Sequence, residues 1–297
     1  MEYVIETVNL TKKFNNKVAV DNVSLHVQKG DIYGFIGRNG AGKTTTMRAI
    51  LGTLIPTSGE IILFGKKDLS DERKRIGSLI EAPGIYKNCT AFENMKRFSL
   101  IAGGDDQQIK ELLEFVGLGN TGVKKAGQFS LGMKQRLGIA IALLGNPELL
   151  VLDEPINGLD PAGIKEIRDL IIKLNKEKGV TFLISSHLLD ELGKIATRYG
   201  IIHSGQLIEE ISAEELQERC KTCLNIVTPD VKKAEEVLEK NGWLHNHKSS
   251  EEKISLYEHV ENPSVINEAL VKAGVRVNEL SFSGSGFEDY FIERLGR

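Results

Sequence analysis

The sequence contains little cysteine and a single tryptophan, and it has no marked excess of charge of either sign. Three cysteines are an odd number and too few for a disulfide framework. A formal net charge of −3 over 297 residues provides no general electrostatic reason to bind nucleic acid or anionic lipid, so we expect no nucleic-acid partner. With 41% apolar and 27% charged residues, the composition is that of an ordinary globular protein with one large or two medium domains.

Long apolar runs are also missing. No run approaches the ~18 residues that a membrane-spanning helix needs. Met1-Glu2-Tyr3 lacks the basic region and apolar core of a signal peptide. These absences predict a cytosolic chain, in which any work on a membrane goes through a partner.

The sequence has few cysteine and histidine residues that could bind zinc. Cys220 and Cys223 form one C-x-x-C, and His245 and His247 follow. A zinc site from these four stays open, but the H-x-H spacing is tighter than the usual H-x₃₋₅-H, and no second cysteine pair is available. Two ordinary thiols are the preferred interpretation.

The sequence does contain a glycine-rich stretch of the form G-x-x-x-x-G-K-[ST]. The apolar, β-prone residues 32–36 precede it, and residues 45–51 can form a helix after it. Strand, glycine-rich turn and helix together identify a phosphate-binding loop. The residues that we expect around the phosphates are Gly37, Asn39, Gly40, Ala41, Gly42, Lys43, Thr44 and Thr45.

The chemistry of this loop follows from its residue types. Glycines let the backbone curl so that successive N–H groups point at phosphate oxygens, and a helix starting near residue 43 adds its partial positive end. Lys43 can then reach the β- and γ-phosphates, and the Thr44 hydroxyl can ligate Mg²⁺. The alternative is a glycine-rich turn that binds nothing, and Lys-Thr in the required positions argues against it.

Around the loop, the pattern predicts an antiparallel region and a helical region. Residues 3–9 and 18–27 alternate apolar and polar positions, as half-exposed strands do, with a turn at Asn15-Asn16. From about residue 91 to 126 the apolar residues recur at helical spacing, and Gly117 lies where a C-terminal glycine cap would fall.

Buried strands and a long helix follow. The continuous apolar runs at 149–152 and 180–184 predict parallel strands covered on both faces. Between them, Pro161 opens a long helix that Gly179 closes. This alternation indicates an α/β core with a mainly parallel sheet.

The last part of the chain has a different pattern. After about residue 218, the predicted order is β-α-β-β-α-β, which is typical of a ferredoxin-like α+β domain. Its strands are expected at 224–228, 243–247, 254–257 and 275–282, and a short helix at about 287–295. It contains no convincing chemical motif.

Carboxylates follow the buried strand at 149–152. Asp153 and Glu154 emerge at the carboxyl end of the sheet, where ligands of open α/β sheets bind. Asp153 can hold Mg²⁺, and Glu154 can activate the water that attacks the γ-phosphate. Such a pair can also cap a helix, but the upstream phosphate loop favours catalysis. A lone histidine such as His187, after the next buried strand, is usually structural, yet here it could hold Glu154 and the water in line.

Taken together, these motifs resemble those of the nucleotide-binding subunits of ATP-binding cassette (ABC) transporters, over residues 1 to about 215. The matching segments are Walker A at 37–45, the Leu-Ser-Gly-Gly-Gln signature at 129–133 with its continuation at 134–136, Walker B at 149–154, the D-loop at 158–160 and the switch histidine at His187. The resemblance implies a P-loop ABC ATPase core at 1–217, with a helical subdomain at about 85–145, and an accessory domain at 218–297. It also implies hydrolysis of ATP coupled to transmembrane transport.

The resemblance assigns further residues. Phe14 falls where the family places an aromatic ring that stacks on adenine, and Asp160 falls in the D-loop. Ser130 and Gly132 of the signature would cap the γ-phosphate of a nucleotide held by the opposite subunit. Because the chain has one Walker A and one signature, either two copies or one copy and a homologue must face each other. Both halves of the site look intact, so we expect a homodimer with two ATP molecules between the subunits.

Two departures from the family pattern matter. In the signature, Leu131 replaces a glycine and Met133 a glutamine. The position of the usual Q-loop glutamine is occupied by Glu81, a harder Mg²⁺ ligand than an amide. A second negative charge near ATP costs about 4 kcal/mol at ~4 Å and an effective dielectric of ~20, so Glu81 should approach only with the metal. The alternative is a solvated turn glutamate.

Glu81 and the signature narrow the resemblance to ATPases of bacitracin-resistance and lantibiotic-immunity exporters, whose permeases are separate polypeptides; the tail at 287–291 is also similar to theirs. The implied role is to energise removal of an antimicrobial peptide, from the cytoplasmic face of the membrane. Three alternatives stay open: another exported cargo, a non-transport ATPase acting on ribosomes or DNA, and a regulatory subunit that binds ATP without turnover.

Overall fold

The computed structural model of the protein describes residues 2–220, 223–258, 261–283 and 287–296. The chain divides into two compact units. The first is Met1–Ala213 with Arg294–Arg297, and the second is Glu214–Glu293. Each unit has a core of its own, made of buried aliphatic side chains.

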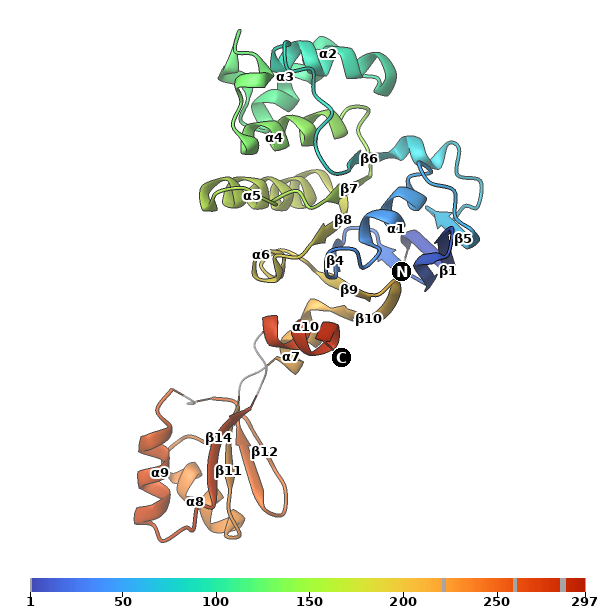
Figure 1. The fold of residues 1–297 in the computed structure, drawn as a ribbon. Helices are drawn as coiled ribbons and strands as arrows, with labels where there is room; N and C mark the ends of the chain where they lie inside the picture. The colour runs from blue at the N-terminus through green and yellow to red at the C-terminus, as the bar shows by residue number, and fades with distance from the viewer. Residues whose placement is uncertain (1, 221–222, 259–260, 284–286, 297) are drawn as a thin grey trace. The chain divides into compact units, whose positions relative to one another are not determined.

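A six-stranded sheet forms the centre of the first unit (Figure 1). Its strands, in spatial order, are β10 (Gln206–Ser212), β9 (Arg198–His203), β4 (Ile32–Ile36), β8 (Thr181–Ser186), β7 (Leu149–Asp153) and β6 (Ile76–Leu79). Five neighbouring strands are parallel, namely β9, β4, β8, β7 and β6. The edge strand β10 is antiparallel to β9. Every residue of β4, β7 and β8 is buried, as the continuous apolar runs predict.

A second, antiparallel sheet is built from three strands before the phosphate loop and one strand after it. It consists of β1 (Tyr3–Phe14), β2 (Lys17–Val23), β3 (His26–Gln28) and β5 (Ser58–Leu63). The single strand predicted at 18–27 is wrong, because the chain forms two strands there. Asn22 has a left-handed backbone (φ 52°), and β1 is long enough to pair β2 at one end and β3 at the other.

Six α-helices belong to the described part of the first unit, and several of them begin at a polar N-cap. They are α1 (Lys43–Ile50), α2 (Ala91–Ala102), α3 (Asp106–Phe115), α4 (Leu131–Ala142), α5 (Pro161–Lys178) and α6 (Leu189–Gly193). Thr90 forms a capping box with Glu93 at the start of α2, and Gly179 ends α5 in a left-handed conformation (φ 65°). α2, α3 and α4 pack on one another, and α4 also packs on α5 and β6.

The second unit is an α+β fold of the ferredoxin-like kind (Figure 1). Its elements are α7 (Ala213–Arg219), β11 (Cys223–Val227), α8 (Val231–Lys240), β12 (His247–Ser249), β13 (Lys253–Leu256), α9 (Pro263–Lys272), β14 (Glu279–Ser283) and α10 (Phe287–Gly296). The sheet is antiparallel with order β12-β13-β11-β14, and apolar residues of α8 and α9 share its core. This confirms the predicted fold class.

One predicted strand of this unit is wrong. Residues 243–246 follow α8 as a loop, and β12 begins only at His247. Trp243 and Leu244 pack against the core of the unit from the loop, so their apolar character reflects burial and not a strand pattern.

Two negative observations apply to the part of the chain that the structure describes. It contains no helix that is both long and apolar enough to cross a bilayer. It also contains no group of three or more His, Cys, Asp and Glu side chains placed to hold a metal ion. Cys220 and Cys223 form no disulfide, and the Cys223 Sγ lies 3.6 Å from the Asn225 amide oxygen.

Candidate nucleotide-binding and hydrolysis site

A pocket of about 320 Å³ lies at the carboxyl end of β4, where the chain turns into α1. Most of its wall comes from the phosphate loop, and the rest from the ends of β1, β2 and β7. The lining residues are Phe14, Lys17, Ala19, Arg38, Asn39, Gly40, Gly42, Lys43, Thr44, Thr45 and Glu154. Eight of the residues that the sequence assigns to nucleotide or catalysis therefore meet here.

The loop takes its shape from glycines in the left-handed region. Gly40 has φ 81° and Gly42 has φ 112°, and Gly42 is the residue before the first turn of α1. A Cβ on Gly42 would lie 2.7 Å from the carbonyl oxygen of Ala19, so no larger side chain fits. Ala41 is buried (5% exposed) beneath the loop. The backbone N–H groups at the start of α1 are thereby available to an anion.

Lys43 is the buried cation of the pocket, with 5% of its side chain exposed. Its Nζ donates to the carbonyl oxygen of Gly37 at 2.6 Å and lies 3.3 Å from Glu154 Oε1. A buried ammonium group needs such partners, because an unpaired one carries a large desolvation cost. A phosphate oxygen offers the same type of partner, so Lys43 is suited to bind one.

Thr44 and Asp153 bring two oxygen ligands together. The Thr44 hydroxyl donates to Asp153 Oδ2 at 2.8 Å, and Asp153 Oδ1 accepts a hydrogen bond from the Ser185 hydroxyl at 2.5 Å. Mg²⁺ prefers oxygen ligands and is usually held by one or two protein groups together with waters and substrate phosphates. This pair beside the phosphate loop therefore fits Mg²⁺ carried in with a nucleotide.

Glu154 has the surroundings of a general base. Its Oε2 is 2.8 Å from Nδ1 of His187, and only 20% of its side chain is exposed. Its Oε1 is buried and accepts no hydrogen bond from any residue that the structure describes. Lys43 Nζ is its ion-pair partner at 3.3 Å, and an oxygen of the pocket that accepts no hydrogen bond can accept a proton from water there.

Phe14 is placed as an aromatic wall of the pocket. It is the last residue of β1, and 46% of its side chain is exposed. The Lys12 Nζ lies 5.0 Å from the ring centroid. An exposed ring at a pocket edge offers a flat face to a base.

The signature residues do not join this pocket. Ser130 is the N-cap of α4, where its hydroxyl accepts from the backbone N–H of Met133 at 3.2 Å, and it is exposed. Gly132 lies in the first turn, next to Gly163 of α5. Asp160 caps α5 by accepting from the Gly163 N–H at 3.1 Å. The N-terminus of α4 is therefore exposed and of the type that binds anions, and it does not line the pocket at the phosphate loop of the same chain.

Glu81 lies elsewhere again, two residues beyond the end of β6. Its backbone is left-handed (φ 62°), and its Oε1 accepts from Arg48 of α1 at 2.7 Å. Of its side chain, 65% is exposed. The structure therefore places this carboxylate on an arginine, one helical turn from Thr44 along α1.

Several residues of the site are missed by sequence reasoning. Lys17 and Arg38 line the pocket, Ser185 holds Asp153, and Arg48 holds Glu81. The signal for Ser185 is a polar residue at the carboxyl end of an apolar strand. Arg48 has no comparable signal, because an arginine in the last turn of a helix is commonly a solvated charge.

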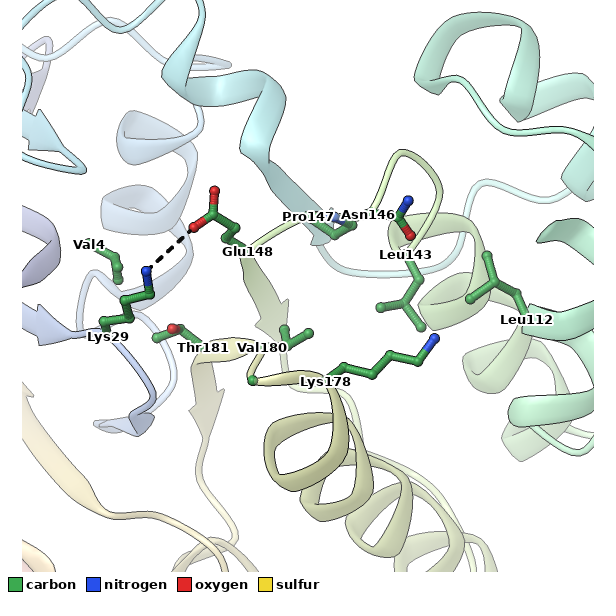
Figure 2. Close-up of a pocket in the computed structure, with 11 residues that line it drawn as sticks. Val4, Lys29, Leu112, Leu143, Asn146, Pro147, Glu148, Lys178, Val180 and Thr181 are labelled. Atoms are coloured by element: carbon green, nitrogen blue, oxygen red, sulfur yellow. Dashed lines mark ion pairs between the residues drawn. The ribbon is translucent and has the colours of Figure 1, made fainter.

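A different hollow of about 440 Å³ opens at the other edge of the sheet, beside the first residues of β7 and β8. Figure 2 shows Leu112 and Lys178 toward one side of it, and Lys29 with its ion pair to Glu148 on the other. The hollow contains none of the residues that the sequence assigns to nucleotide or metal.

The loop, the Thr44–Asp153 pair and the Glu154–His187 pair lie at the carboxyl edge of one parallel sheet, an arrangement that defines the P-loop ATPases. Comparison with known proteins is more specific. The family described as "ABC transporter" matches residues 20–157. The "Bacitracin transport ATP-binding protein BcrA" of Bacillus licheniformis is 44% identical over 301 residues, covering 100% of this chain and 98% of that protein.

Two further proteins extend the comparison. The "Lantibiotic transport ATP-binding protein SrtF" of Streptococcus pyogenes is 45% identical over 207 residues, which is 70% of this chain and 90% of that one. A solved dimer of the ATP-binding cassette MJ0796, in a post-hydrolysis state with ADP and Pi, has a TM-score of 0.63 at 27% identity, covering 70% of this chain and 98% of that chain.

The chain belongs to the ABC transporter family. It is the ATP-binding and ATP-hydrolysing subunit of a transporter of this family. The family resemblance and the ATPase activity that its motifs imply are confirmed.

Proposed function

We propose that this ATPase energises a separate membrane permease that removes an antimicrobial peptide of the bacitracin or lantibiotic type. The observation that carries this proposal is the full-length similarity to a bacitracin transport protein, which extends beyond the ATP-binding core through the second unit. The chain would act as a peripheral subunit on the cytoplasmic face of the membrane. In this proposal, residues 1–217 are the ATP-binding domain, about 85–145 its helical subdomain and 218–297 an accessory domain.

The proposed active form is a homodimer. Because Ser130 and Gly132 lie apart from the pocket of their own chain and at an exposed helix start, they are free to meet the γ-phosphate in the pocket of a second copy. Two copies facing each other make two complete sites, with the Asp160 loops between them. ATP then joins the subunits, and hydrolysis separates them.

Hydrolysis within each site uses the side chains that line the pocket. The loop N–H groups and Lys43 hold the phosphates, and Phe14 stacks on adenine. Thr44 and Asp153 would hold Mg²⁺, which would supply positive charge beside the phosphates. Glu154 accepts the proton of the attacking water, and His187 keeps Glu154 in place through the 2.8 Å contact. Glu81 would be a further metal ligand once it leaves Arg48, and this exchange would link the site to the permease.

Peptide resistance of a susceptible bacterium tests the proposed cargo. The chain is expressed together with a candidate permease subunit, and the minimum inhibitory concentrations of bacitracin and of a lantibiotic are measured. We expect a rise for one of these peptides with the wild-type chain and none with a Glu154→Gln variant. Equal sensitivity of both strains to both peptides contradicts the cargo, and co-purification with ribosomes or DNA in place of the permease contradicts the transport role.

A further inference from the structure

Ser185 occupies the point between the two carboxylates at the end of β7. It is the fifth residue of β8, it is fully buried (0% exposed), and the parallel register places it opposite Asp153. Its hydroxyl donates to Asp153 Oδ1 at 2.5 Å and accepts from the backbone N–H of Glu154 at 2.9 Å. The Ser185 hydroxyl therefore contacts both Asp153, the proposed Mg²⁺ ligand, and Glu154, the proposed general base.

The contact with Glu154 supports an uncommon backbone conformation. Glu154 has φ 51°, in the left-handed region that residues other than glycine rarely adopt. Its N–H lies 2.9 Å from the Ser185 hydroxyl and 3.2 Å from the Ser185 carbonyl oxygen. This conformation points the Glu154 side chain toward Lys43 and His187, and Ser185 supplies both acceptors for the N–H.

The Ser185 hydroxyl couples the position of the Asp153 carboxylate to that of the Glu154 backbone N–H. A serine hydroxyl has one proton to donate, and here that proton goes to Asp153, which leaves a lone pair for the Glu154 N–H. A hydrogen bond to a charged, buried acceptor is stronger than one between neutral groups. Any shift of Asp153 therefore moves the acceptor of the Glu154 N–H.

We propose that Ser185 is a positioning residue for ATP hydrolysis, which fixes the Mg²⁺ carboxylate and the catalytic carboxylate in one arrangement. This inference rests on the proposed roles of Asp153 and Glu154. Ser185 touches neither nucleotide nor water in this scheme. It acts through its two hydrogen bonds to the end of β7.

The test compares Ser185→Ala with Ser186→Ala. Ser186 is the matched control, because it is also buried (1% exposed) but its hydroxyl bonds only to Leu188. For Ser185→Ala we expect kcat for ATP hydrolysis to fall about 10- to 100-fold, the range for losing a hydrogen bond to a charged group. We expect Ser186→Ala to lose much less activity than Ser185→Ala, because the Ser186 hydroxyl contacts neither carboxylate.

Binding of ATP separates positioning from general damage. In EDTA, where no Mg²⁺ connects the nucleotide to Asp153, both variants should bind ATP as wild type does. Added Mg²⁺ should then tighten binding for Ser186→Ala, and much less for Ser185→Ala, because Asp153 has lost a partner. Ser185→Thr retains a hydroxyl and should recover part of kcat. If Ser185→Ala does not fold, Ser185→Cys fills the same space with only a weak donor and should also be slow.

The outcomes distinguish this inference from the proposed function. Wild-type kcat and Mg²⁺ response in Ser185→Ala or Ser185→Cys overturn the positioning role, and so do equal losses in Ser185→Ala and Ser186→Ala. If Glu154→Gln hydrolyses ATP normally, the proposed role of Glu154 itself fails, whatever Ser185 does.

Discussion

The neighbouring strands β6 and β7 are each followed by a glutamate, and the two glutamates differ in how far they are exposed to solvent. β6 and β7 are parallel with Leu79 opposite Leu152, so Glu81 and Glu154 occupy corresponding positions two residues further on. Both glutamates have a left-handed backbone, with φ 62° and 51°. Yet 20% of the Glu154 side chain is exposed, against 65% for Glu81.

The difference lies in the partners. Glu154 lies between Lys43 and His187, and Ser185 accepts its backbone N–H. Removing a partner from such a half-buried group leaves a charge with poor solvation. Glu81 has an exposed ion pair with Arg48, and pairs of this kind contribute ~0–1 kcal/mol. One glutamate is therefore held in place, and the other can exchange partners.

The place of Arg48 makes this exchange specific. Thr44 and Arg48 are four residues apart on α1, so they share one face of the helix, about 6 Å apart along its axis. A carboxylate that leaves Arg48 has the proposed Mg²⁺ ligand as its next neighbour along that face. The comparison thus predicts large effects at Glu154 and small, metal-dependent ones at Glu81.

Replacing Glu154 should have the largest effect. Glu154→Gln keeps the shape of the side chain but cannot take a proton, so the ATP hydrolysis rate should fall at least about 100-fold, within the range for general-base catalysis. Binding of ATP should persist. Phosphate release measures the rate and equilibrium binding measures the affinity. Hydrolysis at the wild-type rate would mean that Glu154 is not the base.

Removing the partner of Glu154 should have the next largest effect. His187→Ala leaves Glu154 without the 2.8 Å contact to Nδ1, and kcat should fall about 10- to 100-fold, as for a lost bond to a charged group. The KM for ATP should change little, because the phosphate loop is untouched. A rise in KM at constant kcat would instead assign His187 to nucleotide binding.

Changing the exposed glutamate should have a smaller effect. Glu81→Gln should keep nucleotide binding and change the hydrolysis rate, or its coupling to transport, by only a few-fold, since a 1.4 kcal/mol difference is tenfold and an exposed pair contributes less than about 1 kcal/mol. ATPase activity and peptide resistance are measured in parallel. Unchanged values in both assays support the alternative that Glu81 is a solvated turn residue.

Removing the partner of Glu81 should have the smallest effect, with a defined sign. Arg48→Met frees Glu81 for the metal, so the Mg²⁺ concentration for half-maximal hydrolysis should fall, by up to about fivefold. The double variant Arg48→Met with Glu81→Gln should lose this gain, because the amide is the weaker ligand. An identical Mg²⁺ response in wild type and Arg48→Met contradicts the exchange of partners.

Contiguous motifs made much of the fold and site predictable. Pro161 and Gly179 bound α5 as predicted, and the strand–loop–helix at 32–51 is present. The ring of Phe14 was assigned by family resemblance, and it does line the pocket. Each of these features depends on neighbours in the sequence or on a motif that the family shares.

The parts that escaped prediction depend on register and tertiary packing. Ser185 meets Asp153 because β7 and β8 pair in one register, and Arg48 meets Glu81 because α1 lies beside the end of β6. Neither follows from spacing along the chain. The wrong strand at 243–247 has the same origin, since Trp243 is apolar because it packs on a core from a loop.

The central claim is that each nucleotide site is completed by the signature of a second copy. The mass of Glu154→Gln in solution, measured by light scattering with ATP and Mg²⁺, tests it most directly. The account predicts a complex of twice the 32.8 kDa chain mass, and its loss when Ser130→Arg is added to the same chain. A particle that stays at the mass of one chain with ATP bound would contradict the account.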